Sequence, residues 1–511
     1  MSIQRLVTWI TFLAIFAMAA KVSIDSDTWW HLRAGQWILE NRAVPEKDVF
    51  SYTRSGAEWE YPGWLVEVPM VLIYQAAGPG GLNLWTAAMI TLAFIFLWQA
   101  LSGGVFLRAF VTILAAAASG VYWAARPHLV TFVLAAVFIW LLETYRWSEQ
   151  GDRSASARLW WLPVLMVLWA NSHGGFIVGF ILLGIYLFSN LLDWLLTVIT
   201  ADRRSATQMG LSKIDDIRVH RPPTSSRQSA AKIIHLCQIA LVMTLAVCLN
   251  PSGPGMLLYP FKTVSIGALG TYIQEWLPPD FHQRSVQPFI WLLLLTFGAV
   301  GVSRRRLALS DFLLVAGFVY LSFMAARNIA LFALAAPVVL TRHASPAADA
   351  LARRFGLHSG AGAVPPRLAR LNRIMLAVMV LAAVVKAGAA LPLEANLAEI
   401  RKTMPVEAVN FIKSTRLPGK LFNSYNWGGY LLWELPGYPV FIDGRTDLYD
   451  DELVDEWLRV VRAEQGWDEL LDRWEVRLVL VEPGTPVVDR LAAAGWVRLY
   501  QDEIAGVYGR Y

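Results

Sequence analysis

Long apolar segments separated by short polar ones make up most of this chain. Eleven of them approach the length of about 20 residues that a helix needs to cross a bilayer. They are residues 6–20, 82–101, 105–124, 127–143, 159–171, 175–198, 233–250, 288–303, 308–325, 328–341 and 371–391. The pattern predicts an α-helical polytopic membrane domain over residues 1–391, with about eleven spans.

Two apolar segments near the start of the chain allow more than one interpretation. Residues 6–20 end in Ala17-Met18-Ala19, a small-residue pattern typical of signal peptide cleavage, but the many later spans favour an uncleaved first helix. Residues 63–75 are apolar but short, and they contain Glu67 and Pro69. We therefore expect a helix lying along the outer surface there, within a first external loop over residues 23–81.

The last part of the chain, residues 392–511, follows a different pattern. Short apolar runs alternate with helical periodicity, which predicts a soluble α/β domain. The strands are expected at residues 420–423, 439–443, 477–481, 497–500 and 504–508.

Charge distribution orients these parts with respect to the membrane. Of the 511 residues, 56% are apolar and only 16% are charged, against about a quarter in soluble domains. Residues 392–511 contain 20 acids and 13 bases, whereas the remainder contains 31 bases and 19 acids. Arg-rich loops favour the cytoplasm, so we expect a cytoplasmic N-terminus in the cell (inner) membrane and a periplasmic C-terminal domain.

Two basic loops account for much of the positive charge. Residues 201–231 and 342–370 are rich in Arg with Ser, Pro, Ala or Gly, which predicts disordered cytoplasmic loops near anionic lipid. The basic pI therefore indicates a lipid bilayer partner, and we expect no nucleic-acid partner.

The first external loop carries the densest group of polar residues next to a span. Asp25 and Asp27 are two residues apart, so on an extended segment their carboxylates point the same way. They can bind a divalent cation such as Mg or Mn, or one can act as a general base. A solvated loop that caps the next helix is the alternative. His31, Arg33 and Asp48 follow in the same loop and are candidate residues for binding the donor or the acceptor.

The predicted topology brings further polar residues to the same side of the membrane. They are Arg126, His128, His173, Glu275, Arg327 and Asn328. Polar groups at membrane depth usually mark a site, and Arg with His suits a phosphate-bearing substrate. Glu275 lies in an external loop, residues 251–287, that either closes over the substrate or only connects spans, and it is a third candidate metal ligand. Snorkelling Arg and satisfied His side chains are the alternatives.

Two motifs in the C-terminal domain are candidate binding sites. Trp427 precedes Gly428-Gly429, which permits a close backbone approach to a ligand. Asp443 and Arg445 directly follow a predicted strand, where ligand sites of α/β sheets collect. Ordinary turn chemistry is the alternative for both motifs.

Several of these motifs resemble the GT-C superfamily of membrane glycosyltransferases. Asp25-Ser26-Asp27 with Trp29-Trp30 is similar to the acidic loop of oligosaccharyltransferase catalytic subunits, and residues 271–275 to their Glu-bearing external loop. Residues 62–65 resemble the surface helix of protein O-mannosyltransferases. Residues 425–430 are similar to the Trp-Trp-Asp-Tyr-Gly acceptor motif, with Asn426 where Asp is expected.

This resemblance implies an enzyme that transfers a sugar, with inversion, from a polyprenyl-phosphate donor on the outer face of the membrane. Asp25 or Asp27 would be catalytic, and the acceptor would be a protein, a lipid or a polysaccharide. A lipid or glycan transporter (flippase) and an inactive GT-C-like scaffold are the alternatives. The absence of a sequence repeat and the scarcity of charges within the spans weigh against a transporter.

Overall fold

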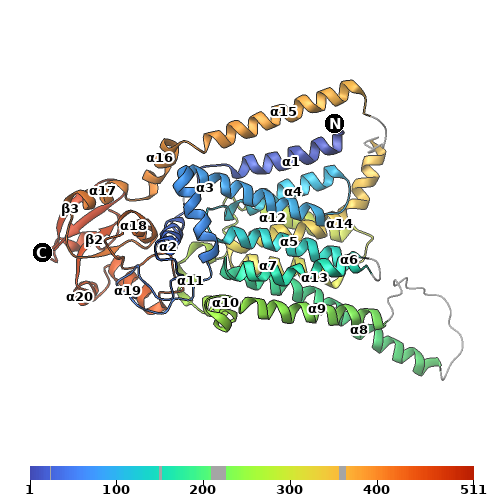
Figure 1. Ribbon diagram of the computed structural model, residues 1–511, viewed down its shortest axis with the longest axis horizontal. Helices are drawn as coiled ribbons and strands as arrows, with labels where there is room; N and C mark the ends of the chain where they lie inside the picture. The colour runs from blue at the N-terminus through green and yellow to red at the C-terminus, as the bar shows by residue number, and fades with distance from the viewer. Residues whose placement is uncertain (24, 149–151, 209–225, 356–363, 511) are drawn as a thin grey trace.

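The computed structural model describes residues 1–511 except 24, 149–151, 209–225, 356–363 and 511. The molecule consists of a bundle of long helices and a C-terminal domain that lies against one end of this bundle (Figure 1). The helix α2 (Thr28–Asn41) lies between the two.

Each of the eleven predicted spans falls on a helix of the bundle. Seven helices of the described chain are long and apolar enough to cross a membrane, and three more apolar helices are shorter. The bundle helices are α1 (Ile3–Ala19), α3 (Trp64–Ala100), α4 (Val105–Ser119), α5 (His128–Trp147), α7 (Trp161–Ala170), α8 (Ile177–Gln208), α9 (Ser226–Val247), α12 (Gln287–Val302), α13 (Leu309–Met324), α14 (Ile329–Arg354) and α15 (Pro366–Ala389). The short α6 (Arg153–Leu159) precedes α7. The predicted fold class, a polytopic helical membrane protein with a C-terminal α/β domain, is confirmed.

Burial differs sharply among these helices. α5 and α14 are buried along most of their apolar length, and α15 packs mainly on α1 with little of its surface covered. Apolar side chains that α15 leaves exposed are suited to lipid contact. The core of the bundle therefore surrounds α5 and α14, which also begin next to the polar residues described below.

A kink at Gly78 divides α3 into two parts. Gly78 has φ 59° and ψ −158°, a conformation that only glycine adopts readily, and Pro79 follows it. The predicted surface helix, residues 63–75, corresponds to the part before the kink, and the predicted span 82–101 to the part after it.

The helices extend further into the two basic loops than predicted. α8 continues to Gln208, and α14 continues past the expected end at residue 341 to Arg354. Arg342 lies inside α14 because it pairs with Glu143 of α5 and Asp311 of α13, which balances its charge. The remaining parts of both loops, residues 209–225 and 356–363, lie outside the described residues.

The C-terminal domain contains a four-stranded sheet with the order β1-β2-β4-β3. The pair β1–β2 is parallel, and the pairs β2–β4 and β4–β3 are antiparallel. The strands are β1 (Lys420–Asn423), β2 (Val476–Val481), β3 (Val497–Gln501) and β4 (Gly506–Gly509). The helices are α16 (Leu393–Thr403), α17 (Val406–Thr415), α18 (Gly428–Glu434), α19 (Asp451–Val461), α20 (Trp467–Arg473) and α21 (Val488–Leu491).

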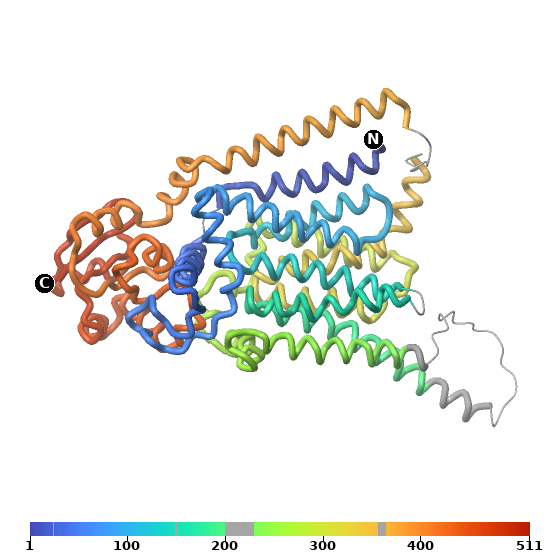
Figure 2. Tube along the Cα trace, in the orientation of Figure 1, coloured from blue at the N-terminus to red at the C-terminus, as the bar shows by residue number. Residues whose placement is uncertain are grey.

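The predicted strand at residues 439–443 is not part of this sheet. Val440 instead pairs with the first external loop: its N–H donates to Phe50 O, and its carbonyl accepts from the Tyr52 N–H, each at 3.2 Å. Figure 2 shows this blue loop lying against the orange C-terminal domain. Residues 440–443 are buried, but the partner of Val440 is a segment almost 400 residues away.

Candidate functional site

The first external loop holds two aspartates at the start of α2. Asp27 precedes the first residue of α2, and Asp25 Oδ1 accepts a hydrogen bond of 2.9 Å from the Asp27 N–H. The Thr28 hydroxyl donates to Ala125 O at 3.0 Å. This hydrogen bond holds the start of α2 next to the segment that contains Arg126.

Five charged residues from four segments meet next to the start of α2, at the end of the bundle that faces the C-terminal domain. Arg126 Nη2 lies 2.8 Å from Asp27 Oδ2, and Arg126 Nη1 lies 3.1 Å from Glu275 Oε2 and 3.5 Å from Asp25 Oδ2. Arg327 Nη1 lies 3.0 Å from the other oxygen of Glu275. We call these five residues the carboxylate–arginine cluster. Its three carboxylates outnumber its two guanidinium groups.

Protonation differs among the carboxylates of the cluster. Burial raises the pKa of Asp27 to about 7; Arg126 opposes the shift, whereas Asp25 and Glu275 add to it. Burial also disfavours ionisation of Glu275, but Arg126 and Arg327 outweigh it and lower the pKa of Glu275 to about 2. Asp27 is therefore the carboxyl group of this pair that exchanges a proton near neutral pH.

Three histidines surround the cluster, and each is fixed by a different contact. His173 Nδ1 accepts from the Gly175 N–H at 3.0 Å and lies 2.9 Å from the Thr131 hydroxyl. His128 Nε2 donates to Tyr122 O at 2.7 Å. His31 Nδ1 contacts a carboxylate oxygen of Glu67 on α3. The rings of His128 and His173 have their centroids 6.4 Å apart.

The loop 251–287 reaches the cluster through a series of short helices. These are α10 (Tyr259–Val264), α11 (Gly267–Tyr272) and the 3-10 turn Gln274–Trp276, which carries Glu275. The C-terminal domain holds this loop: the Tyr259 hydroxyl donates to Asp447 at 2.9 Å, and Asp451 accepts from the N–H groups at the start of α11. Glu275 is thus presented by a docked loop.

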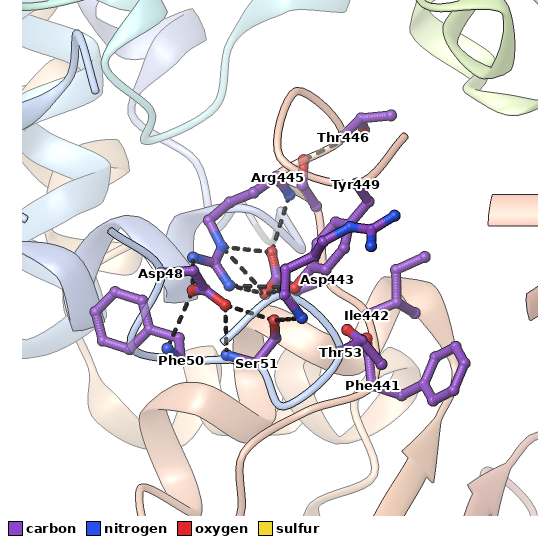
Figure 3. Close-up of polar contacts among 12 residues, drawn as sticks. Asp48, Phe50, Ser51, Thr53, Phe441, Ile442, Asp443, Arg445, Thr446 and Tyr449 are labelled. Carbon is purple, nitrogen blue, oxygen red and sulfur yellow. Dashed lines mark hydrogen bonds and ion pairs between the residues drawn. The ribbon is translucent and has the colours of Figure 1, made fainter. Parts of the chain in front are cut away.

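Three predicted binding residues form a separate, fully buried group. Arg445 Nη1 lies 2.7 Å from Asp48 Oδ1, and Arg445 Nη2 lies 2.7 Å from Asp443 Oδ2 (Figure 3). The Tyr449 hydroxyl donates to the same Asp443 oxygen at 2.8 Å. Asp48, Asp443 and Arg445 are at most 2% exposed. They bind one another, so in this structure they join the first external loop to the C-terminal domain.

Three other predicted binding residues make local contacts outside the cluster. Arg33 lies 3.6 Å from Glu40 on the same helix. The Asn328 amide donates to Leu321 O at 2.9 Å, and the Trp427 indole donates to Thr403 O at 2.9 Å. The contacts of Asn328 and Trp427 stabilise the end of α13 and the packing of the C-terminal domain, respectively.

Two glycines of the C-terminal domain lie against the start of α2. A Cβ added to Gly444 would overlap Asp27 Oδ1, and one added to Gly429 would lie 2.7 Å from Ser26 O. The close approach predicted for Gly428-Gly429 is therefore made to other parts of the chain: Gly428 faces Ile442 and Asp443. No pattern along the chain predicts the contact between Gly444 and Asp27, whereas Glu67 is visible in the sequence as an acid within an apolar segment.

Three carboxylates of the cluster, those of Asp25, Asp27 and Glu275, are the predicted ligands of a metal ion. Among the described residues, no group of three or more His, Cys, Asp or Glu side chains is arranged to hold a metal ion. Asp25, Asp27 and Glu275 all face the Arg126 guanidinium instead. A divalent cation bound by the three carboxylates would therefore share them with Arg126 or displace it.

Comparison with known proteins identifies the fold. No protein-family model matches the chain, and no curated protein sequence matches it either. The structure is similar to the archaeal oligosaccharyltransferase AglB from Archaeoglobus fulgidus in complex with an inhibitory peptide and a dolichol-phosphate. That match has a TM-score of 0.55 at 12% identity and covers 94% of this chain and 70% of AglB.

Two further solved structures show the same likeness. The apo form of the Archaeoglobus fulgidus oligosaccharyltransferase matches with a TM-score of 0.56 at 14% identity, over 93% of this chain and 69% of that chain. A mutant of arabinofuranosyltransferase AftD from Mycobacteria matches with a TM-score of 0.50 at 13% identity, over 100% of this chain and 42% of AftD. The predicted resemblance to GT-C glycosyltransferases is confirmed at the level of the fold.

Proposed function

We propose that this protein is a membrane glycosyltransferase that transfers a sugar from a polyprenyl-phosphate-linked donor to an acceptor on the outer face of the membrane. The observation that carries the proposal is the carboxylate–arginine cluster, in which Arg126 joins Asp25, Asp27 and Glu275. Its position at the end of a bundle with a GT-C fold supports the same function.

Arg126 and Arg327 are suited to hold the donor phosphate. Guanidinium groups bind phosphate oxygens through paired hydrogen bonds and keep their charge at every physiological pH. Glu275 pairs with both arginines in this structure, one through each carboxylate oxygen. A bound phosphate group would take over part of that pairing, and the two arginines would then stabilise the charge that develops on the leaving phosphate.

Asp27 is the group best placed to act as general base. An acceptor hydroxyl or amide would attack the anomeric carbon, lose its proton to the Asp27 carboxylate, and the bond from that carbon to the donor phosphate oxygen would break. The products would be the glycosylated acceptor and the polyprenyl phosphate. A base with a pKa near the working pH is effective in such a transfer. Asp25 shares the same arginine and is the second candidate.

A divalent cation, Mg²⁺ or Mn²⁺, remains part of the proposal. Asp25, Asp27 and Glu275 offer the oxygen ligands that such hard cations prefer. Bound there, the cation would add positive charge for the donor phosphate. Arg126 contacts all three carboxylates and supplies such charge in the structure.

The orientation in the membrane is proposed from charge. With the N-terminus in the cytoplasm, the cluster and the C-terminal domain would face the periplasm, where lipid-linked sugar donors meet their acceptors. The proposed reaction is transfer of a hexosyl group to a protein, a lipid or a polysaccharide.

Sugar transfer by the purified protein tests the proposed function. The full chain is reconstituted in liposomes with polyprenyl-phosphate donors carrying labelled sugars, and lipid, peptide and polysaccharide fractions are supplied as acceptors. We expect label to enter one of these fractions. Transport of the intact donor across the bilayer without transfer would instead favour the flippase alternative, and binding without either activity would favour the scaffold.

A further inference from the structure

The buried pair formed by His31 and Glu67 lies near the carboxylate–arginine cluster, close enough for the charge of Arg126 to act on the His31 ring. His31 lies in the first turn of α2, and its backbone N–H donates to the backbone carbonyl of Asp27 at 3.2 Å. His31 is 6% exposed and Glu67 is fully buried. The pair also joins α2, which Asp27 directly precedes, to the part of α3 before the kink at Gly78.

Two glycines lie against Glu67: Gly35 faces its backbone carbonyl, and Gly63 faces its carboxyl group. A Cβ added to Gly35 would overlap the Glu67 carbonyl, and one added to Gly63 would lie 2.8 Å from Glu67 Oε1. That same Oε1 atom contacts His31 Nδ1, whereas Oε2 is buried and has no hydrogen-bond partner among the described residues. An ionised carboxylate with one unpaired buried oxygen is costly, so the neutral acid fits this position best.

The neighbours of His31 also disfavour a charged ring. Burial lowers the pKa of His31 well below its usual value, and Arg126, His173 and His128 act in the same direction. The Trp30 ring lies on the imidazole, with centroids 3.5 Å apart and an interplanar angle of 32°. The O–H group of a neutral carboxylic acid donates a hydrogen bond to Nδ1, so the single proton of the neutral ring lies on Nε2.

His173 reaches the same state through a different contact. Its Nδ1 accepts from the Gly175 N–H, so a neutral ring carries its proton on Nε2. Burial lowers the pKa of His173 to about 3, with Arg327 and Arg126 adding to the shift. The neutral rings of His31 and His173 therefore both accept a hydrogen bond at Nδ1 and carry their proton on Nε2, where it can be donated to a ligand.

We propose that Glu67 is a positioning residue that holds His31 with its proton on Nε2, so that His31 donates a hydrogen bond to a phosphate oxygen of a polyprenyl phosphate bound at Arg126. The inference rests on the proposed function for the identity of the ligand. A neutral donor adds a directed hydrogen bond without adding another charge to the cluster. Glu67 acts only through the ring it orients.

The tautomer of His31 gives a test that needs no substrate. The full-length protein is labelled with ¹⁵N-histidine, and the His31→Gln variant assigns the signal of His31 by its disappearance. At pH 7.5 we expect a neutral ring with the proton on Nε2. A proton on Nδ1, or a doubly protonated ring, would overturn the proposal without any reference to sugar transfer.

Ligand binding by Glu67 variants tests the functional consequence. A glutamine side chain can still donate to Nδ1 through its amide, so Glu67→Gln should bind undecaprenyl phosphate within about threefold of the unmodified protein, whereas Glu67→Ala should bind it about 10- to 100-fold more weakly. Glu40→Gln, on the exposed face of α2, is the matched control and should bind normally. Unfolding transitions of all variants are compared, so that a loss of fold is recognised.

The binding experiment also distinguishes the possible phosphate sources. Undecaprenol, which lacks the phosphate, should not respond to Glu67→Ala, and inorganic phosphate should compete only weakly. Equal binding by Glu67→Ala and the unmodified protein, or an equal loss in Glu67→Gln and Glu67→Ala, would overturn the positioning role. If the tautomer and the binding results are as expected but no sugar is transferred, the proposed function fails and the phosphate-binding role stands.

Discussion

Gly444 of the C-terminal domain lies so close to Asp27 of the first external loop that a single methyl group on Gly444 would overlap the Asp27 carboxylate. The same Asp27 carboxylate pairs with Arg126 at 2.8 Å. The C-terminal domain therefore forms a wall of the carboxylate–arginine cluster and limits where Asp27 can lie.

The first prediction follows from this contact. Gly444→Ala should push the Asp27 carboxylate away from Arg126 and lower kcat about 10- to 100-fold, since small misplacements of a reacting group are costly. The overall fold should persist, because the added methyl group displaces only the end of the Asp27 side chain and no backbone atom. Gly437→Ala is the matched control, as an added Cβ there meets nothing within 4 Å. Equal rates for the two variants would contradict the contact.

The second prediction concerns Arg126. Arg126→Lys keeps the charge but loses the planar fork that reaches three carboxylates, so binding of undecaprenyl phosphate should weaken by about 10- to 100-fold. Binding is measured by titration of the full-length protein in detergent. Arg284→Ala, an exposed arginine of the loop 251–287, should bind like the unmodified protein. Unchanged binding by Arg126→Lys would remove Arg126 from the phosphate site.

The third prediction is the pH dependence of transfer. A general base works in its ionised form, and burial raises the pKa of Asp27 to about 7. The value of kcat/KM should therefore fall about tenfold for each pH unit below 7 and level off above it. Glu275, with a pKa of about 2, should stay ionised throughout and add no second step.

The Asp27→Asn variant completes this test. It should lower the rate by about 10²- to 10⁴-fold, as expected for the loss of a general base, and it should abolish the step near pH 7. A step that persists in Asp27→Asn would assign the titration to another group, with Asp25 as the next candidate.

The fourth prediction concerns the buried group that joins the first external loop to the C-terminal domain. Arg445→Met leaves Asp48 and Asp443 buried without their cation, so we expect a loss of about 3–5 kcal/mol in the free energy of unfolding. The junction should also become open to proteolysis. Arg477→Met, an exposed arginine on β2, should change stability little. Similar losses for both variants would mean that Arg445 has no special role.

Local pattern was sufficient to predict the membrane part of the fold. The eleven apolar segments coincide with helices of the bundle, because an apolar segment in a bilayer must satisfy its backbone hydrogen bonds within itself. The run 439–443 was wrongly predicted as a strand, because an apolar stretch does not specify its pairing partner. Likewise, the extension of α14 beyond residue 341 depends on the distant partners of Arg342.

For the candidate site, the sequence predicts only which polar residues lie on the same side of the membrane. Asp25, Asp27, Arg126, Glu275 and Arg327 do meet in the structure. Asp443 and Arg445 looked equally suited to bind a ligand, but Asp48, almost 400 residues earlier, binds Arg445 instead. The contact between Gly444 and Asp27 depends on backbone placement, which leaves no pattern along the sequence.

The most direct test of the whole account is sugar transfer from a polyprenyl-phosphate donor by the Asp25→Ala, Asp27→Ala double variant in liposomes. A double variant of two acids on α20, Asp468→Ala with Asp472→Ala, is the control. We expect transfer by the unmodified protein and the control, and none above background by the Asp25, Asp27 variant. Unchanged turnover in the Asp25, Asp27 variant would contradict this expectation.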